Sequence, residues 1–267
     1  MAFWGGAFVF DGIPCEEFEL MIYDIGNHTQ SSRKFASTAT IVEEKIASRY
    51  KPYFYGVTFD NKLKFTLVFG LNEQRVSAND FLTGQEMDTV ASWLTGHSEY
   101  KWLEIIQPDM EFIRYRCMIT DLEVIEYGWI PWAFKATVEC DGPFGYERQT
   151  EHEYIISGNN QIHFENRSSY NGYYYPTLEI RINSGDKVVI ENVTDNGRTL
   201  EFTGLPTSAS DIKIDCGTGI ITGSSGLNLY PYCNLKFLRL KKGENILNIS
   251  YDGTIKFICE FPINMGG

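Results

Sequence analysis

The residues of this chain that could carry out catalysis are acidic side chains that lie close together in the sequence. Four such pairs are Glu16/Glu17, Glu43/Glu44, Glu123/Glu126 and Asp211/Asp215. A glycoside hydrolase needs two carboxyl groups about 5–9.5 Å apart across a sugar-binding cleft. On a strand, Asp211 and Asp215 would share a face about 13 Å apart, and Glu123 and Glu126 would face opposite sides. We interpret these pairs as solvated surface charges, and a β-sandwich glycoside hydrolase is the third-ranked function.

Other signatures of catalysis or cofactor binding are missing from the sequence. Gly223-Ser-Ser-Gly226 is one residue too short for the Gly-x-Ser-x-Gly elbow of hydrolases, and no glycine-rich phosphate-binding motif occurs. The six cysteines are widely spaced without a Cys-x-x-Cys pair, and there are four histidines, which argues against a zinc site of neighbouring ligands. We predict reduced, buried thiols and a protein that is not an enzyme, with no catalytic residues, no metal and no cofactor.

The densest aromatic segment is Tyr170–Pro176, which contains Tyr173, Tyr174 and Tyr175. Aromatic rings stack on sugars, but they also fill domain cores and the centres of subunit interfaces. The aromatic residues of Trp129-Ile-Pro-Trp132 could likewise stack on a sugar or pack in a core or a subunit interface. We favour core packing or a contact between subunits for this segment, and Tyr173, Tyr174 and Tyr175 are the candidates for contact with a peripheral protein partner or a sugar. A carbohydrate-binding protein that uses a sandwich over residues 153–267 is therefore the alternative function.

Strands dominate the elements that must position these residues. Aromatic residues make up 15% of the 267 residues and there are 24 glycines, a composition typical of sheets and turns. Apolar and polar residues alternate cleanly over residues 62–69 and 132–140. Thr83-Gly-Gln-Glu86 has the pattern of a capping box, and apolar residues at helical spacing follow it as far as Leu94. One amphipathic helix among strands predicts a helix that covers a sheet.

Turn signals complete this outline. Asp11-Gly12 lies between Ala7–Phe10 and Phe18–Tyr23 and predicts a hairpin of these two runs. Residues 24–40 are polar and irregular, as in a loop or an extended arm, and Tyr53–Phe59 is strand-like. Asp252-Gly253 predicts a second hairpin near the end of the chain.

Chain breakers indicate two domains. Asp141-Gly-Pro-Phe-Gly145 stops a strand and precedes a charged stretch, so we place the boundary near residues 141–152. Evenly spaced short strands follow, which is the pattern of a β-sandwich or jelly roll. We predict a mainly β protein with an N-terminal β-sandwich and one α-helix at 1–146, and a C-terminal β-sandwich at 147–267. No apolar run is long enough to span a membrane, and no secretory signal is expected.

The formal net charge of −12 is concentrated in the first domain. Residues 1–146 contain 21 acidic and 12 basic side chains, a charge of −9, whereas residues 147–267 contain 14 and 11, a charge of −3. No stretch is basic, which argues against a protein that grips nucleic acid or an anionic membrane. Acidity aids solubility, and it is also compatible with a protein that DNA slides past without sticking.

The order and spacing of several segments resemble the distal tail proteins, a tail component family of siphovirus-type phages. The resemblance covers nearly the whole chain, and the sequence departs from the family's pattern at residues 27–52. The segments that carry it are Phe8-Val-Phe-Asp-Gly-Ile, Glu17-Phe-Glu-Leu20, Trp93-Leu94, Tyr100-Lys-Trp-Leu-Glu104, Phe134–Gly145, Phe164-Glu-Asn166, Tyr175-Pro-Thr-Leu178, Ile212–Cys216 and Phe237–Asn245.

This resemblance implies a structural hub at the tail tip rather than an enzyme. The first domain would form a homo-hexameric ring that continues the tail tube, and the second, a galectin-like or jelly-roll sandwich, would lie outside the ring. The implied partners are the tail tube protein, a tail-tip hub or tail-associated lysin-type protein, and a receptor-binding or adhesion protein. DNA would pass through the lumen without specific binding. The implied location is the virion tail tip, after assembly in the host cytoplasm.

We predict that the opening hairpin and the 27–52 arm make the contacts between copies. The residues chosen are Phe8 and Phe10 in the hairpin, and Arg33, Phe35 and Tyr50 in the arm. Closure of the ring would also hide sheet edges that otherwise favour aggregation.

An acidic lumen should repel DNA and keep it from sticking during passage. Changing the carboxylates that face the lumen to amides should therefore slow DNA ejection, measured on assembled virions. The same number of changes in the second domain serves as the control. Ejection at an unchanged rate in the lumen variants would contradict the hypothesis.

Overall fold

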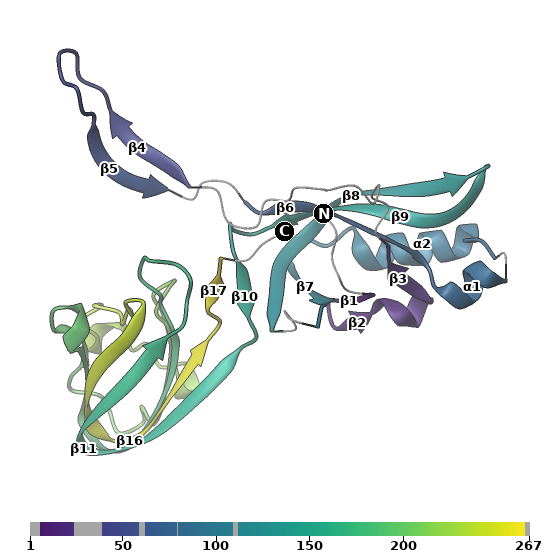
Figure 1. Ribbon diagram of the computed structural model, residues 1–267. Coiled ribbons are helices and arrows are strands. Elements are labelled where there is room, and N and C mark those ends of the chain that lie inside the picture. The colour runs from purple at the N-terminus through teal and green to yellow at the C-terminus, as the bar shows by residue number, and fades with distance from the viewer. Residues whose placement is uncertain (1–5, 24–38, 59–61, 79, 109–111, 265–267) are drawn as a thin grey trace. The chain divides into compact units, whose positions relative to one another are not determined.

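The computed structural model describes residues 6–23, 39–58, 62–78, 80–108 and 112–264 (Figure 1). This part of the chain is mainly β, as the sequence predicts. It divides into two compact units, of which the second spans Glu147–Pro262. The first unit ends at Tyr146 and also includes the end of the chain from Ile263. Ile263 packs in the core of the first unit, although it lies beyond the second unit in the sequence.

One antiparallel sheet with the strand order β2-β1-β7-β8-β9-β6-β3 forms the first unit. Along β6, alternate residues point into the core, where Phe65, Leu67 and Phe69 are buried. The strands are β1 (Ala7–Phe10), β2 (Ile13–Pro14), β3 (Leu20–Ile22), β6 (Lys64–Leu71), β7 (Lys101–Ile106), β8 (Ile113–Tyr127) and β9 (Ile130–Cys140). The short strands β10 (Gly145–Glu147) and β17 (Pro262–Ile263) pair with each other.

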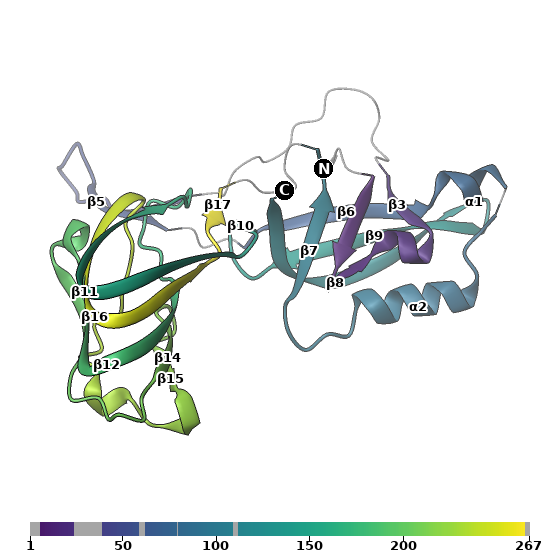
Figure 2. The ribbon, with the colours of Figure 1, turned by 90° about the horizontal axis from the view of Figure 1, so that it is seen from below.

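The predicted helix is α2 (Gly84–Leu94), which lies beside the strands of this sheet in Figure 2. Its capping box is complete, with the Thr83 side chain accepting from the Glu86 N–H and the Glu86 carboxylate accepting from the Thr83 N–H. Trp93 anchors the helix to the sheet, because its indole N–H donates to the Phe10 carbonyl at 3.2 Å. The helix therefore covers the sheet, as its pattern predicts.

A second helix corrects the prediction of a single one. The helix α1 (Glu73–Ser77) has five residues and is capped by the Asn72 side chain, which accepts from the Arg75 N–H. One and a half turns are too short for an apolar period to be recognised in the sequence.

The predicted opening hairpin is wrong in its second strand. Asp11 and Gly12 do turn the chain with positive φ angles of 51° and 80°, but β1 returns into the two-residue β2. The 3₁₀ helix η1 (Cys15–Phe18) follows, and β3 then pairs with β6 rather than with β1.

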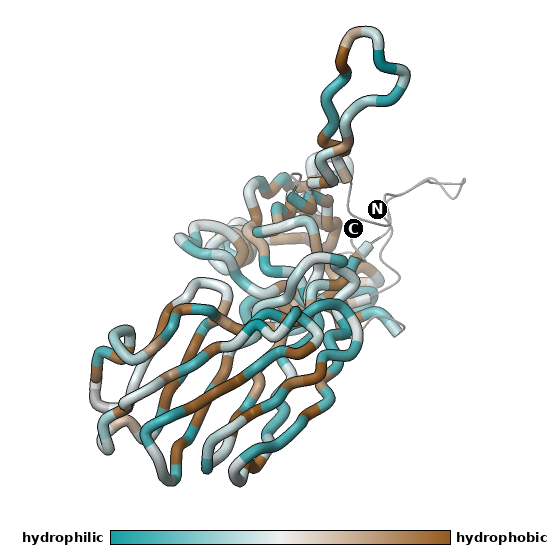
Figure 3. Tube along the Cα trace, turned by 90° about the vertical axis from the view of Figure 1, so that its left-hand side faces the viewer, coloured by the Kyte–Doolittle hydropathy of each residue, from teal (hydrophilic) through white to brown (hydrophobic). Residues whose placement is uncertain are grey.

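The second unit contains a sheet with the order β11-β16-β12-β14-β15, with β13 also paired to β12. Figure 3 shows the alternation of hydrophobic and hydrophilic residues along its long strands. The strands are β11 (Thr150–Asn166), β12 (Thr177–Asn192), β13 (Arg198–Phe202), β14 (Asp211–Asp215), β15 (Ile220–Gly223) and β16 (Gly243–Cys259). The 3₁₀ helices are η2 (Val193–Asp195), η3 (Ser224–Gly226) and η4 (Tyr230–Tyr232).

Gly253 lies inside β16 and does not turn the chain, which corrects the hairpin predicted at Asp252-Gly253. A Cβ atom at Gly253 would lie 1.9 Å from the Arg181 carbonyl oxygen, and φ is +156° there. The register between β12 and β16 shifts at the same level, after Ile182. The glycine therefore serves a close approach of two strands at a bulge.

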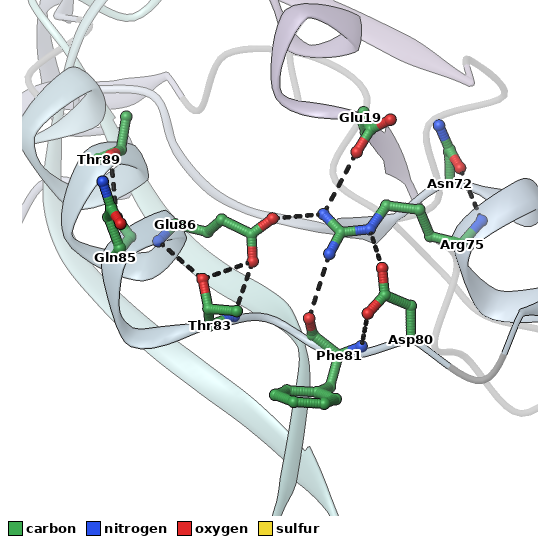
Figure 4. Close-up of polar contacts among 9 residues, drawn as sticks. All are labelled: Glu19, Asn72, Arg75, Asp80, Phe81, Thr83, Gln85, Glu86 and Thr89. Carbon is green, nitrogen blue, oxygen red and sulfur yellow. Dashed lines mark hydrogen bonds and ion pairs between the residues drawn. The ribbon is translucent and has the colours of Figure 1, made fainter.

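Arg75 connects α1 to the start of α2 (Figure 4). Its guanidinium donates to the Asp80 carboxylate at 2.6 Å and to the Glu86 carboxylate at 2.7 Å. It also donates to the Phe81 carbonyl at 3.2 Å and lies 3.4 Å from the Glu19 carboxylate. The hydrogen bonds from Arg75 lower the pKa of Asp80 and of Glu86.

Arg75→Ala should lower the free energy of unfolding by about 1–3 kcal/mol, because charge-assisted hydrogen bonds are lost from a side chain that is 13% exposed. The folded pKa values of Asp80 and Glu86 lie below their unfolded values, so this stabilisation is complete above the unfolded values. It is lost as the pH falls through the folded values. Urea unfolding at several pH values measures both effects.

The control is Arg116→Ala, since the Arg116 side chain is half exposed and lies 3.9 Å from the Asp141 carboxylate. It should cost less than about 1 kcal/mol. Equal losses in the two variants would contradict the special role of Arg75.

Candidate self-assembly surface

Residues Thr40–Thr58 form a two-stranded sheet of their own. They overlap the arm predicted at residues 27–52, and from here on the name arm refers to Thr40–Thr58. The strands β4 (Thr40–Glu44) and β5 (Tyr53–Thr58) pair antiparallel, and within the described ranges neither pairs with any other strand. Figure 1 shows them as a separate ribbon. A two-stranded hairpin is marginally stable in water unless a further surface supports it. The arm therefore has the structure of a segment that needs a partner.

The arm exposes an unusual number of apolar side chains. Their exposure ranges from 40% at Val42 to 91% at Tyr50. The set is Ile41, Val42, Ile46, Tyr50, Tyr53, Phe54, Tyr55 and Val57. Contiguous apolar surface of this kind marks an interaction site, because leaving it in water is unfavourable.

Cations accompany these rings at the tip of the arm. Residues 45–52, which we call the arm tip, contain Lys45, Arg49 and Lys51 and no acidic residue. The Arg49 guanidinium lies 4.4 Å from the Tyr53 ring centroid, and the Lys51 ammonium lies 5.5 Å from the Tyr50 ring centroid. The arm tip thus presents aromatic and cationic groups together, which suits an acidic or aromatic partner.

The residues predicted for self-contact have three different outcomes. Tyr50 lies at the exposed arm tip, and Arg33 and Phe35 lie outside the described residues. Phe8 and Phe10 are 1% and 0% exposed, so the prediction that they contact another copy is corrected. The Phe8 ring packs against Trp93 at 5.6 Å between centroids, because this face of β1 points into the core beneath α2.

The three tyrosines of the aromatic cluster have separate environments. The Tyr174 ring lies 4.8 Å from that of Phe261, and its buried hydroxyl accepts from the Glu260 N–H at 2.8 Å. Burial raises the pKa of Tyr174. Tyr173 is partly exposed and lies 3.8 Å beneath the Arg239 guanidinium, while Tyr175 is exposed. Tyr174 therefore stabilises the domain, and partner or sugar contacts by Tyr173 and Tyr175 stay a prediction.

Three of the acidic residues considered for catalysis have structural partners. The Glu123 carboxylate accepts from Lys135 at 2.7 Å, and Asp211 accepts from Arg181 at 3.0 Å. Asp215 accepts from the Gly217 N–H at 2.9 Å in a turn. Nowhere in the described ranges do three or more His, Cys, Asp or Glu side chains form a group able to hold a metal. The described helices are also too short or too polar to cross a bilayer.

Comparison with known families decides the class of the protein. The model of a family described as "Phage tail protein N-terminal domain" matches residues 5–142, and that of "Phage tail C-terminal domain" matches residues 144–259. The chain belongs to this family of phage tail proteins. The resemblance in the sequence to a phage tail component is thereby confirmed.

Solved structures share the fold of this phage tail protein. The crystal structure of SPP1 Dit (gp 19.1), described as a paradigm of the hub adsorption apparatus in Gram-positive infecting phages, has a TM-score of 0.66 at 10% identity and covers 96% of this chain and 98% of its own. The phage P2 baseplate in its activated conformation with Ca contains a chain with a TM-score of 0.50 at 11% identity, with 91% and 90% covered. No curated protein sequence matches this phage tail protein.

Sequence reasoning missed the first strand of the arm. Thr40-Ile-Val42 is a β-branched run, which is a strand signal, but only five residues form β4 and two glutamates end it. The exposed rings of Phe54 and Tyr55 on β5 follow no alternation, so the sequence could not assign them to a core or to a surface.

Tyr174→Phe should lower the free energy of unfolding of this tail protein by about 1–3 kcal/mol, because the Glu260 N–H loses its acceptor in a buried site. Tyr154→Phe is the matched control, since the Tyr154 hydroxyl makes no hydrogen bond to another described residue. Urea unfolding measures both. An equal, small effect in the two variants would show that the hydroxyl of Tyr174 has no structural role.

Proposed function

We propose that this phage tail protein is a structural hub of the tail tip of a long-tailed phage. Six copies form a ring that joins the tail tube to the tail-tip and baseplate proteins, and DNA passes through its lumen. The observation that carries this proposal is the fold shared with SPP1 Dit over 96% of the chain, within a family of phage tail proteins. That protein is described as a paradigm of the hub adsorption apparatus, and a structural role of this kind is what we propose for this chain.

The arm provides the contact between copies in this proposal. Its exposed apolar side chains are not covered by either strand of its own two-stranded sheet. Burial of such surface against a neighbouring copy contributes about 25 cal/mol for each Å² of apolar area removed from water. Contact with a neighbour also stabilises the isolated hairpin itself, so assembly and ordering of the arm support each other.

The two domains have different tasks. The first, with its formal charge of −9 from 21 acidic and 12 basic residues, forms the ring and surrounds a lumen that repels DNA. The second, a galectin-like sandwich, lies outside the ring and binds a receptor-binding or adhesion protein. The tail tube protein and a tail-associated lysin-type hub protein bind the two faces of the ring. The protein acts at the virion tail tip and is assembled in the host cytoplasm.

Purified protein should form rings with six-fold views in negative-stain images and a matching mass by light scattering. The combined change Tyr50→Ser, Phe54→Ser and Val57→Ser should abolish the rings, because it removes apolar surface from the arm while leaving the core of the domain intact. Imaging and scattering at equal protein concentration compare the two proteins.

The matched control changes three exposed apolar residues of the second domain, Ile155→Ser, Val193→Ser and Ile220→Ser, and should leave the rings unchanged. Rings that persist in the arm variant would show that the arm is not the contact. A wild-type chain that stays monomeric even with the tail tube and hub proteins present would overturn the proposed hub function.

A further inference from the structure

A second exposed aromatic surface lies where β8 turns into β9. We call residues Asp121–Pro131 the hairpin end. Tyr127 is 83% and Trp129 is 91% exposed, and Val124 and Ile130 are exposed beside them in the sequence. Two large aromatic rings that are almost fully exposed on one turn are uncommon on a monomeric protein. Aromatic residues contribute much of the binding energy at protein interfaces. The hairpin end is therefore a binding surface in its own right.

The backbone at the turn supports this interpretation. Gly128 and Trp129 have φ angles of 59° and 73°, as in a tight hairpin turn whose two central residues both need positive φ. Glycine, asparagine and aspartate adopt that conformation readily, whereas bulky side chains seldom do. The strained position of Trp129 is not offset by burial of its ring within the chain, which is what a contact outside the chain would provide.

Charge indicates which partner fits. The hairpin end contains Asp121, Glu123 and Glu126, and residues 117–134 contain no lysine or arginine. Glu123 forms an ion pair with Lys135 at 2.7 Å, and Asp121 also interacts with the Lys135 charge, whereas Glu126 forms no ion pair within the part of the chain that the structure describes. The arm tip has the opposite character, with Lys45, Arg49 and Lys51 around the exposed Tyr50 and Ile46.

We propose that the arm tip of one copy binds the hairpin end of the next copy. This inference rests on the proposed ring and names the surface that receives the arm. Arg49 and Lys51 pair with Asp121 and Glu126, and one of the two cations lies on the Trp129 ring. A head-to-tail contact of two different surfaces is also what a cyclic ring needs, because each copy must offer one surface to either neighbour.

Contacts between like surfaces are disfavoured by the same charges. An arm tip against an arm tip would bring three cations of each copy together, and two hairpin ends would bring three carboxylates of each copy together. Either contact would also be two-fold symmetric, which gives a dimer instead of a ring.

The test uses two charge-reversal variants of the full chain. Arg49→Glu with Lys51→Glu alters the arm tip, and Asp121→Lys with Glu126→Lys alters the hairpin end. Each variant alone should lose rings and associate at least about tenfold more weakly in mass photometry. The chain that carries all four changes should regain rings, because opposite charges face each other again. Lys236→Glu with Lys242→Glu, in exposed positions of the second domain, is the control and should leave the rings intact.

Mixing the two single-surface variants gives the sharpest result. The intact arm tip of one variant then faces the intact hairpin end of the other, and the reversed arm tip faces the reversed hairpin end. Rings in which the two variants alternate in a 1:1 ratio are therefore expected. Rings in either variant alone, or no rings in both the four-fold variant and the mixture, would falsify this docking while leaving the hub function standing. A wild-type protein that never forms rings with its tail partners present would instead remove the hub function itself.

Discussion

Burial of apolar side chains within each domain is the interaction on which the rest of this structure depends. The core of the first domain is closed by the sheet and by α2, where the Trp93 ring lies between Phe8 and Phe18 at centroid distances of 5.6 and 4.4 Å. None of the arm residues takes part in that core. The core of the first domain therefore contains no arm residue, and the apolar side chains of the arm stay exposed.

The second domain also buries a core of its own, and long paired strands build it. Its long strand β16 pairs with β11 on one side and with β12 on the other, and the close approach at Gly253 lies where the register between β12 and β16 shifts. Several buried polar groups are also paired inside it, although the Tyr251 hydroxyl is buried without a hydrogen bond to a described residue. The Asp195 carboxylate, which has no exposed surface, accepts from the half-buried Arg239 at 2.7 Å.

Local rules predicted the parts of the fold that local physics determines. The capping box at Thr83 and the alternation along β6 and β9 were sufficient because each sets backbone and side-chain directions within a few residues. Phe8 and Phe10 show where such reasoning ends. A period of two indicates that both rings share a face, but whether that face meets α2 or another copy depends on residues such as Trp93, which is 83 positions from Phe10. The hairpin predicted at Asp252-Gly253 was wrong for a similar reason, because a glycine is suited both to a turn and to a close approach of two strands.

The candidate surface was harder to predict than the core because exposure is a property of the whole fold. Trp129 and Trp132 occur in one short motif, yet Trp129 is 91% exposed while Trp132 is partly covered, with its ring 5.3 Å from that of Tyr23. The positive charges of the arm tip are informative only when they are compared with the net negative charge of the rest of the domain. In a domain of net charge −9, with 21 acidic and 12 basic residues, a run of three cations without an acid is the exception. The field of one copy therefore attracts the arm tip of another before any contact forms, and the hairpin end then supplies both the carboxylates and the ring that hold it.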